Sequence, residues 1–261
     1  MKGTVMKRTL VFAKRNFIEI SRDMLTYIFC IAFPIVMLII MTLINESIPA
    51  DAGMTIFRID NLTGGVIIFG QTFVMLFTSL SVSRDRTGSF LIRMFATPMK
   101  SGNFTNGYLL PMTVIAVIQA VVTFIPAYII SVIVSNPLNP AGILAALFAV
   151  LPSAVMFTAI GLIFGTLFNQ NAAPGICSII ISLGSFLGAI WFDAEATGGV
   201  LYSICRCLPF IYCTKAARAA IRLDFGTENF IIPELIVIGV AAVLTVLASA
   251  VFKTRMKADL S

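Results

Sequence analysis

Residues 141–168 read AGILAALFAVLPSAVMFTAIGLIFGTLF, an apolar run without a charged side chain. An α-helix rises about 1.5 Å per residue, so about 20 apolar residues cross the hydrocarbon core of a bilayer. The run therefore predicts a transmembrane helix. It lies inside a longer stretch, residues 101–192, that contains no Asp, Glu, Lys or Arg.

Two turn signals divide this uncharged stretch. Residues 136–140 (NPLNP) and 169–175 (NQNAAPG) contain prolines, which lack the backbone N–H that a helix needs. The same length criterion applies to the rest of the chain, with Pro34 as a kink in the first span. The six predicted spans are residues 25–44, 66–82, 108–135, 141–168, 175–192 and 231–252.

The whole composition agrees with a membrane protein. Hydrophobic residues make up 59% of the chain and charged residues 11%, less than half the roughly 25% typical of soluble domains. We expect an all-α integral membrane protein without a cleavable signal peptide, because no cleavage site follows the first apolar run. The net charge of +6 flanks the spans, which argues against nucleic-acid binding.

Basic residues orient the predicted bundle. Thirteen of the eighteen lie in the amino-terminal segment, the loop after the second span and the carboxyl-terminal tail. Cytoplasmic loops are enriched in Lys and Arg, so both termini are predicted to be cytoplasmic. Residues 193–230 lie outside in this scheme. Within them, 200–213 are apolar but too short to span, which predicts a re-entrant or interfacial segment followed by a short helix over 214–223.

The amino terminus predicts a helix lying at the membrane surface. Its apolar residues recur at steps of three and four, with Lys7, Lys14 and Arg15 largely elsewhere. This pattern fits a simple topogenic anchor or a lever that a partner pushes. The apolar stripe comprises Met6, Leu10, Ala13, Phe17, Ile20 and Met24.

The loop after the second span, residues 84–98 (RDRTGSFLIRMFATP), predicts a short helix with an apolar face and a basic rim. Such a helix can dock into a groove of another protein. The alternative is an ordinary positive-inside loop. The residues of interest are Arg84, Asp85, Arg86, Gly88, Phe90, Leu91, Arg93, Met94, Phe95, Thr97 and Pro98.

Two GxxxG patterns, Gly161–Gly165 and Gly184–Gly188, predict close helix packing, within the chain or between subunits. No catalytic residues, metal site or phosphate-binding loop are evident, and the chain has no histidine. Cys205, Cys207 and Cys213 are read as thiols, with one disulfide left open. The span interiors lack ionisable groups, so the energy for uphill transport would come from another chain.

These features in this order resemble the permease subunit of an ABC-2 type exporter. The resemblance covers nearly the whole chain, residues 1–261, as one transmembrane domain. The loop matches the family pattern from Arg84-Asp85-Arg86-Thr87-Gly88 to Thr97-Pro98, although Ser83 replaces a frequent acid. In the outer segment Leu208-Pro209, Tyr212, Ala216 and Arg218 match in spacing, whereas Lys215 stands where an acid is common.

The resemblance implies a multi-pass protein of the plasma membrane, of bacterial type. It also implies a second permease copy and a separate ABC ATPase subunit, which would bind ATP and magnesium and contact the 84–100 loop and the amino-terminal helix. The cargo would be an amphiphilic or lipid-like molecule such as a drug, antibiotic, peptide or lipid. A self-sufficient secondary carrier or channel, a membrane-embedded lipid enzyme, and a signalling or immunity subunit of the same family are the alternatives.

Overall fold

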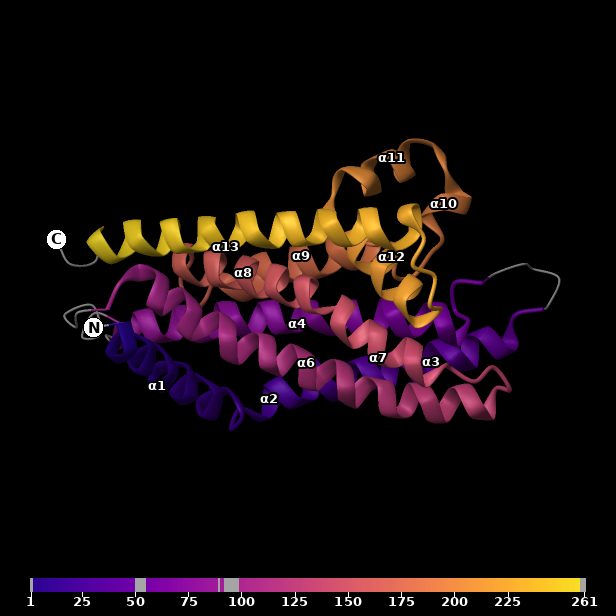
Figure 1. Cartoon of the computed structure of the whole chain (residues 1–261), viewed down its shortest axis with the longest axis horizontal. Helices are drawn as coiled ribbons and strands as arrows, with labels where there is room; N and C mark the ends of the chain where they lie inside the picture. Colours follow the sequence, from indigo (N-terminus) through magenta and orange to yellow (C-terminus); the bar gives the residue numbers. More distant parts are fainter. Residues whose placement is uncertain (1, 50–54, 89, 92–98, 259–261) are drawn as a thin grey trace.

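The computed structural model describes residues 2–49, 55–88, 90–91 and 99–258. These residues form helices and no strand. Most helices run along the long axis of the molecule (Figure 1). The start of α1 (Lys2–Ile20) and the end of α13 (Ile232–Ala258) lie at the same end of this axis, which we name the terminal end; the opposite one is the far end.

Five segments of the described chain are long and apolar enough to cross a bilayer, which confirms a multi-pass helical architecture. The fifth predicted span, residues 175–192, corresponds to the shorter apolar helix α9 (Ala173–Leu187). The five are Met24–Ser47 (α2 Met24–Tyr27, a π-helical turn Ile28–Ala32 and α3 Phe33–Ser47), α4 (Ile59–Thr87), α6 (Ser101–Ile133), α7 (Pro140–Ala149) with α8 (Leu151–Leu167), and Thr227–Arg255 (a π-helical turn Thr227–Ile231 and α13).

Helix α4 occupies the centre of the bundle, surrounded by α3, α6, α8, α9 and α12 (Pro209–Ile221). Its Leu62, Val66 and Met75 are completely buried. A helix that is buried all round belongs to a core. In contrast, α3 and α13 expose large apolar side chains such as Leu43 and Val246, a surface that lipid would solvate.

The predicted break at residues 136–140 is confirmed. Helix α6 ends at Ile133, and the Asn139 side chain accepts a hydrogen bond from Ala141 N (2.9 Å) to cap α7. A second break, which was not predicted, separates α7 from α8 at Val150. Pro152 cannot donate to the carbonyl four residues back, and Gln71 Nε2 of α4 donates to the Val150 carbonyl at this point (3.0 Å).

Several predicted boundaries were wrong. Helices α4 and α6 begin at Ile59 and Ser101, whereas residues 66 and 108 were predicted. Helix α4 continues to Thr87 instead of ending at Val82, so Arg84, Asp85 and Arg86 belong to a helix rather than to a loop. Helix α9 ends at Leu187, before the predicted 192, because the chain turns at Ala189 with a positive φ of 53°. Helix α12 begins at Pro209 rather than at 214, since proline suits the first helical turn.

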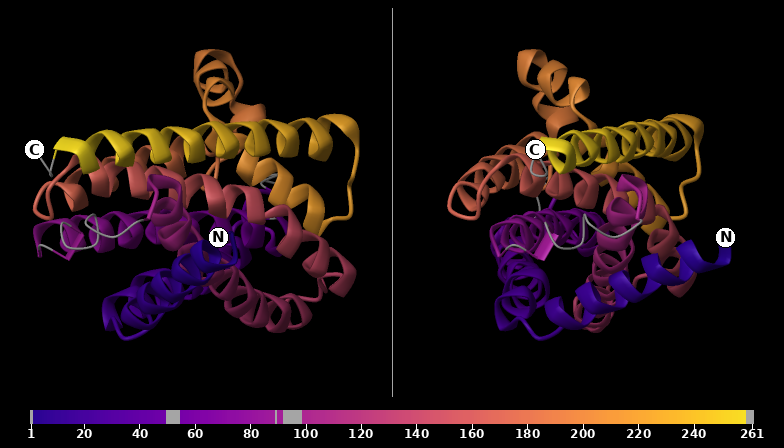
Figure 2. Two further views of the ribbon diagram at one scale, coloured as in Figure 1. Left: turned by 60° about the vertical axis from the view of Figure 1, so that its left-hand side comes forward. Right: turned by 90° about the vertical axis from the view of Figure 1, so that its left-hand side faces the viewer.

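Two short helices, α10 (Ala194–Thr197) and α11 (Gly199–Cys207), project sideways from the far half of the bundle (Figures 1 and 2). At the terminal end, α1 runs obliquely across the other helices (Figure 2). Helix α1 therefore marks the terminal end of the molecule, and α10 with α11 marks the far half. One group of predicted site residues lies beside each of these.

Candidate functional site

The densest polar cluster lies at the terminal end, where it joins α1, α4 and α6. Arg15 donates through Nη1 to Asp85 Oδ2 (2.7 Å) and through Nη2 to Asp85 Oδ1 (3.1 Å). Tyr108 Oη donates to the same Oδ2 (2.6 Å), and Glu19 Oε2 lies 2.7 Å from Arg15 Nη2. Bidentate, charge-assisted pairs are the strongest hydrogen bonds of this kind. We name Arg15, Glu19, Asp85 and Tyr108 the Arg15 cluster.

The Arg15 cluster is shielded from solvent on the α4 and α6 side. The Asp85 side chain is 4% exposed and Tyr108 is fully buried, whereas the Arg15 side chain is 35% exposed. Burial alone would lower the pKa of Arg15, but the hydrogen bond and the charge of Asp85 outweigh burial and raise it. Arg15 therefore keeps its charge and holds α1 against the bundle.

Aromatic packing supports the same junction. The ring of Phe12 packs edge-on against Phe104 and Tyr108, with centroids 5.7 and 5.1 Å apart. Gly107 permits this contact, because a Cβ atom there would overlap the Phe12 ring. The carbonyl of Gly107 also accepts a hydrogen bond from Asn16 Nδ2 (3.0 Å). Backbone contact and side-chain bonds together fix α1 on α6.

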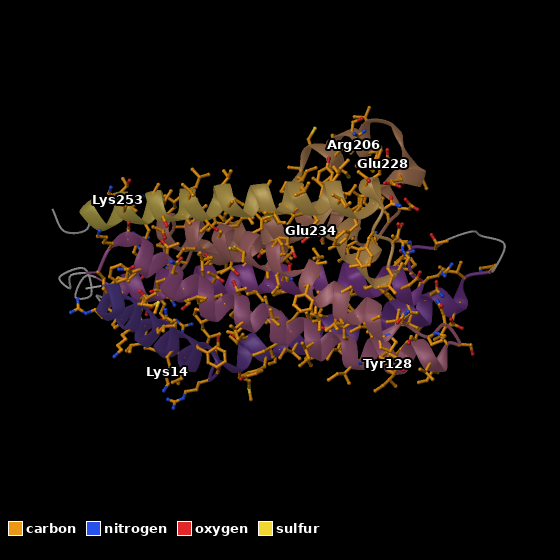
Figure 3. The ribbon with its side chains drawn as sticks, viewed as in Figure 1. Lys14, Tyr128, Arg206, Glu228, Glu234 and Lys253 are labelled. Carbon is orange, nitrogen blue, oxygen red and sulfur yellow. The ribbon has the colours of Figure 1, made fainter. Side chains whose placement is uncertain are left out.

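The predicted apolar stripe of α1 overlaps only in part with the face that packs on the bundle. Met6, Leu10 and Met24 are each more than half exposed, while Ala13 and Ile20 are buried. Helical periodicity identifies apolar positions but not the surroundings that cover them. Lys7 and Lys14 are exposed, and Figure 3 shows Lys14 near the terminal end. The packed face comprises Thr9, Phe12, Ala13, Asn16 and Ile20.

Residues after the second span also turn inward. Leu91 is fully buried, and the Arg15 guanidinium lies 4.2 Å from the Phe90 ring centre. Leu91 therefore packs within the chain, contrary to the expectation that it faces a partner, whereas Phe90 is half-buried against Arg15. Arg84 is exposed, as is Gly88, whose N–H donates to the Arg84 carbonyl (2.9 Å) as α4 ends. Arg93, Met94, Phe95, Thr97 and Pro98 lie outside the described residues.

Arg86 connects the end of α4 to the end of α8. Its Nη1 donates to the carbonyl of Thr166 and lies 3.4 and 3.5 Å from those of Gly165 and Phe168. The last carbonyls of a helix have no partner within the helix, and a cation near them is favourable. Arg86 therefore acts as a cap for α8.

The predicted outer motif lies at the far end, where Arg218 is its best-connected residue. Arg218 Nε donates to the carbonyl of Asn61 (2.9 Å) and Nη2 to that of Ile190 (3.2 Å), which ties α12 to α4 and to the end of α9. Burial, followed by the like charge of Arg222, lowers the pKa of Arg218 to about 10, so it stays protonated at neutral pH. The close approach uses Gly64, where a Cβ atom would lie 3.0 Å from Arg218 Cγ.

The other residues of this motif have local roles. Pro209 opens α12, and Tyr212 Oη donates to the Arg206 carbonyl (2.8 Å) across the α11–α12 break. Lys215 forms an ion pair with Glu195, a pairing that the sequence did not suggest. A cleft of about 410 Å³ lies beside these residues, between α12, α10, the start of α4 and the π-helical turn that precedes α13.

The two GxxxG patterns lie in different environments. A Cβ atom on Gly161 would overlap the Met75 carbonyl, and one on Gly165 would lie 2.5 Å from the Ser79 carbonyl, so α8 approaches the α4 backbone closely. Gly184 has more space, since its nearest neighbour is the Phe210 ring at 3.7 Å. Gly188 ends α9.

Among the described residues no group of three or more His, Cys, Asp or Glu side chains could hold a metal ion. The five cysteines are free thiols, so the disulfide left open by the sequence is not formed. Cys207 is exposed, whereas Cys205 and Cys213 are buried. The contacts described above for Arg15, Arg86 and Arg218 therefore join helices to one another.

Sequence reasoning missed Tyr108, Asn16, Gly107 and Phe12. Tyr108 was assigned only as the first residue of a span. Asn16, a polar side chain on α1 that follows Lys14 and Arg15, carried no sign that it faced inward. The only available signal was Gly107, a small residue that allows close approach between helices.

Comparison with protein families agrees with this architecture. The family model described as ABC-2 type transporter matches residues 7–221, from α1 through α12. The search of curated proteins gave no match. Since the family match covers well over half of the sequence, this chain belongs to the ABC-2 type transporter family, whose members are permease components of ABC-type transporters.

Proposed function

We propose that this chain is the permease subunit of an ATP-driven exporter, powered by a separate ABC ATPase that binds ATP and magnesium. The proposal rests on the Arg15 cluster, which fixes the surface helix α1 to α4 and α6. A force applied to α1 would therefore reach the central helix of the bundle. Family membership makes an ATPase the expected source of that force.

The contact with the ATPase would use exposed basic residues around the Arg15 cluster. Lys7, Lys14 and Arg84 are exposed at the terminal end, while Arg15 and Phe90 face each other inside it. ATPase closure would displace α1 and the end of α4 together. Coupling requires that ATP binding favours one conformation of the pathway over the other.

The proposed topology has six spans, with α9 as the short fifth one, and both termini in the cytoplasm of a bacterial cell. Helices α10–α12 would then form a re-entrant outer segment. The native Cys207 tests this, because it is exposed whereas the other cysteines are buried. A membrane-impermeant maleimide should label intact cells and lose that labelling in Cys207→Ser. Labelling that appears only after permeabilisation would place Cys207 on the cytoplasmic side and would indicate the opposite topology.

The proposed cargo is amphiphilic or lipid-like. Residues 101–192 contain no charged side chain, and large apolar side chains on α3, α6 and α13 face outward. Such surfaces favour a molecule that partitions into the membrane over a hydrated ion. A second copy of the chain would complete the pathway.

Reconstitution tests the proposal directly. The full chain, with its ATPase captured from native membranes, should hydrolyse ATP and move substrate only when both subunits are present. Arg84→Glu should weaken the complex, whereas Arg206→Glu, at the far end, should not (Figure 3). Gradient-driven flux by the chain alone, without ATP, would support a secondary carrier instead.

A further inference from the structure

The cleft at the far end is lined by both basic and acidic side chains. These side chains differ in whether they have charged or hydrogen-bonding partners within the chain. Three basic residues line it on one helical stripe: Lys215 and Arg218 of α12, and Arg222 at its C-cap. Their spacing of three and four residues puts them on the same side of the helix. Three acids also line the cleft, so its formal charges balance. Which of these charged groups can bind a further ion depends on the partners that each already has within the chain. The acids are Asp193, Glu195 and Asp224.

The acids of the cleft are engaged locally. Asp193 Oδ1 accepts from the backbone N–H groups of Glu195 and Ala196 (3.0 Å each) and caps α10. Glu195 Oε1 binds Lys215 and accepts from Tyr202 Oη (3.3 Å). Asp224 accepts from the backbone N–H of Gly226 and from Asn229 Nδ2 (2.7 Å). Each carboxylate therefore has donors of its own.

Neither arginine forms an ion pair with a carboxylate of the described residues, and the charges of Asp193 and Asp60 act on Arg218 only from a distance. Arg218 donates to two backbone carbonyls, which are neutral acceptors. Arg222, the C-cap residue one turn beyond Arg218, is exposed and makes no ion pair or side-chain hydrogen bond with the described part of the chain. Two neighbouring guanidinium groups repel each other, and an anion between them would relieve that repulsion.

We infer that this cleft binds a phosphate anion, free or as the headgroup of an anionic amphiphile, with Arg222 as its principal ligand and Arg218 as its inner wall. Guanidinium groups match phosphate because their planar N–H pairs bond two oxygens at once. A volume of about 410 Å³ accommodates a headgroup. The inference does not depend on transport, so its failure would leave the proposed function standing.

The single tryptophan of the chain provides the reporter. Trp191 follows Ile190, whose carbonyl accepts the Arg218 bond, and precedes Asp193 by two residues. Purified full-length protein in phosphate-free maltoside micelles is titrated with inorganic phosphate, with phosphatidylglycerol and with phosphatidylcholine. We expect a saturable change in Trp191 fluorescence with inorganic phosphate or phosphatidylglycerol, and a weaker response to phosphatidylcholine, whose headgroup carries a compensating cation.

Variants separate this site from general charge effects. Arg222→Gln removes one charge-assisted contact from an exposed position and should raise the half-saturating concentration roughly tenfold or more. Arg206→Gln, the matched exposed arginine on α11 outside the cleft, should leave it unchanged. Saturation by inorganic phosphate identifies a free anion, and saturation by phosphatidylglycerol alone identifies a headgroup. No saturation with either probe, or equal weakening by both variants, overturns the inference.

Discussion

Replacing Asp85 by asparagine should loosen α1 from the bundle. The carboxylate accepts two bonds from Arg15 and one from Tyr108, whereas the neutral amide offers one acceptor oxygen. A hydrogen bond to a charged group contributes about 1.5–3 kcal/mol. Because Arg15 is 35% exposed, solvent screens part of its attraction. We expect a loss of about 2 kcal/mol, which raises the open fraction of α1 roughly thirtyfold.

Hydrogen–deuterium exchange of the purified full chain measures this opening. Amides in the second half of α1 should exchange roughly thirtyfold faster in Asp85→Asn, while those of α8 stay unchanged. Tyr108→Phe, which removes one bond of the three, should have a smaller effect. A double-mutant cycle with Arg15→Met should show a coupling of about 2 kcal/mol. Unchanged exchange in α1, or additive effects of the two substitutions, would refute the reasoning.

Three further substitutions test the packing, each by thermal unfolding in detergent. Gly107→Ala should destabilise the protein by about 1–3 kcal/mol, because the new methyl group overlaps the Phe12 ring of α1. Its control is Gly102→Ala in the same helix, where the space around the residue is open. That change should be neutral or stabilise the protein by up to about 1 kcal/mol. Gln71→Leu should cost about 1–2 kcal/mol, since the amide bridges α4 to the α7–α8 break and accepts from Ser153. Arg86→Ala should cost about 1–2 kcal/mol by removing the donor at the end of α8.

Much of the fold could be predicted because its determinants are local. Span length follows from runs of apolar residues, and the break at 136–140 follows from two prolines and the capping Asn139. The break at Val150 escaped prediction, since Pro152 sits in an otherwise continuous apolar run and prolines also occur inside the unbroken helix α6. Whether a proline ends a membrane helix depends on neighbours such as Gln71, which come from elsewhere in the chain.

The candidate sites were harder to predict because charge alone does not tell a lysine from an arginine. Counting positive charges orients the chain and treats all basic residues alike. The structure separates them. Lys7, Lys14 and Lys100 are exposed, whereas Arg15 and Arg218 direct their guanidinium groups at defined acceptors on other helices. A planar guanidinium presents its donors in a fixed fork, whereas the three donors of an ammonium group have no such fixed planar arrangement.

The arginines that are bonded to other helices show where the peripheral helices are attached to the core of the molecule. Each end has an arginine that ties a peripheral helix to α4: Arg15 joins α1 at the terminal end, and Arg218 joins α12 at the far end. Between them α4 is buried along its length, so a shift at one end has to be accommodated by neighbouring helices or passed on along its axis. Arg→Lys exchange at either position keeps the net charge and the predicted topology, yet should weaken the connection. A charge count would register no change in either variant, so a loosened α1 or α12 in these variants would show that geometry, rather than charge, makes the link.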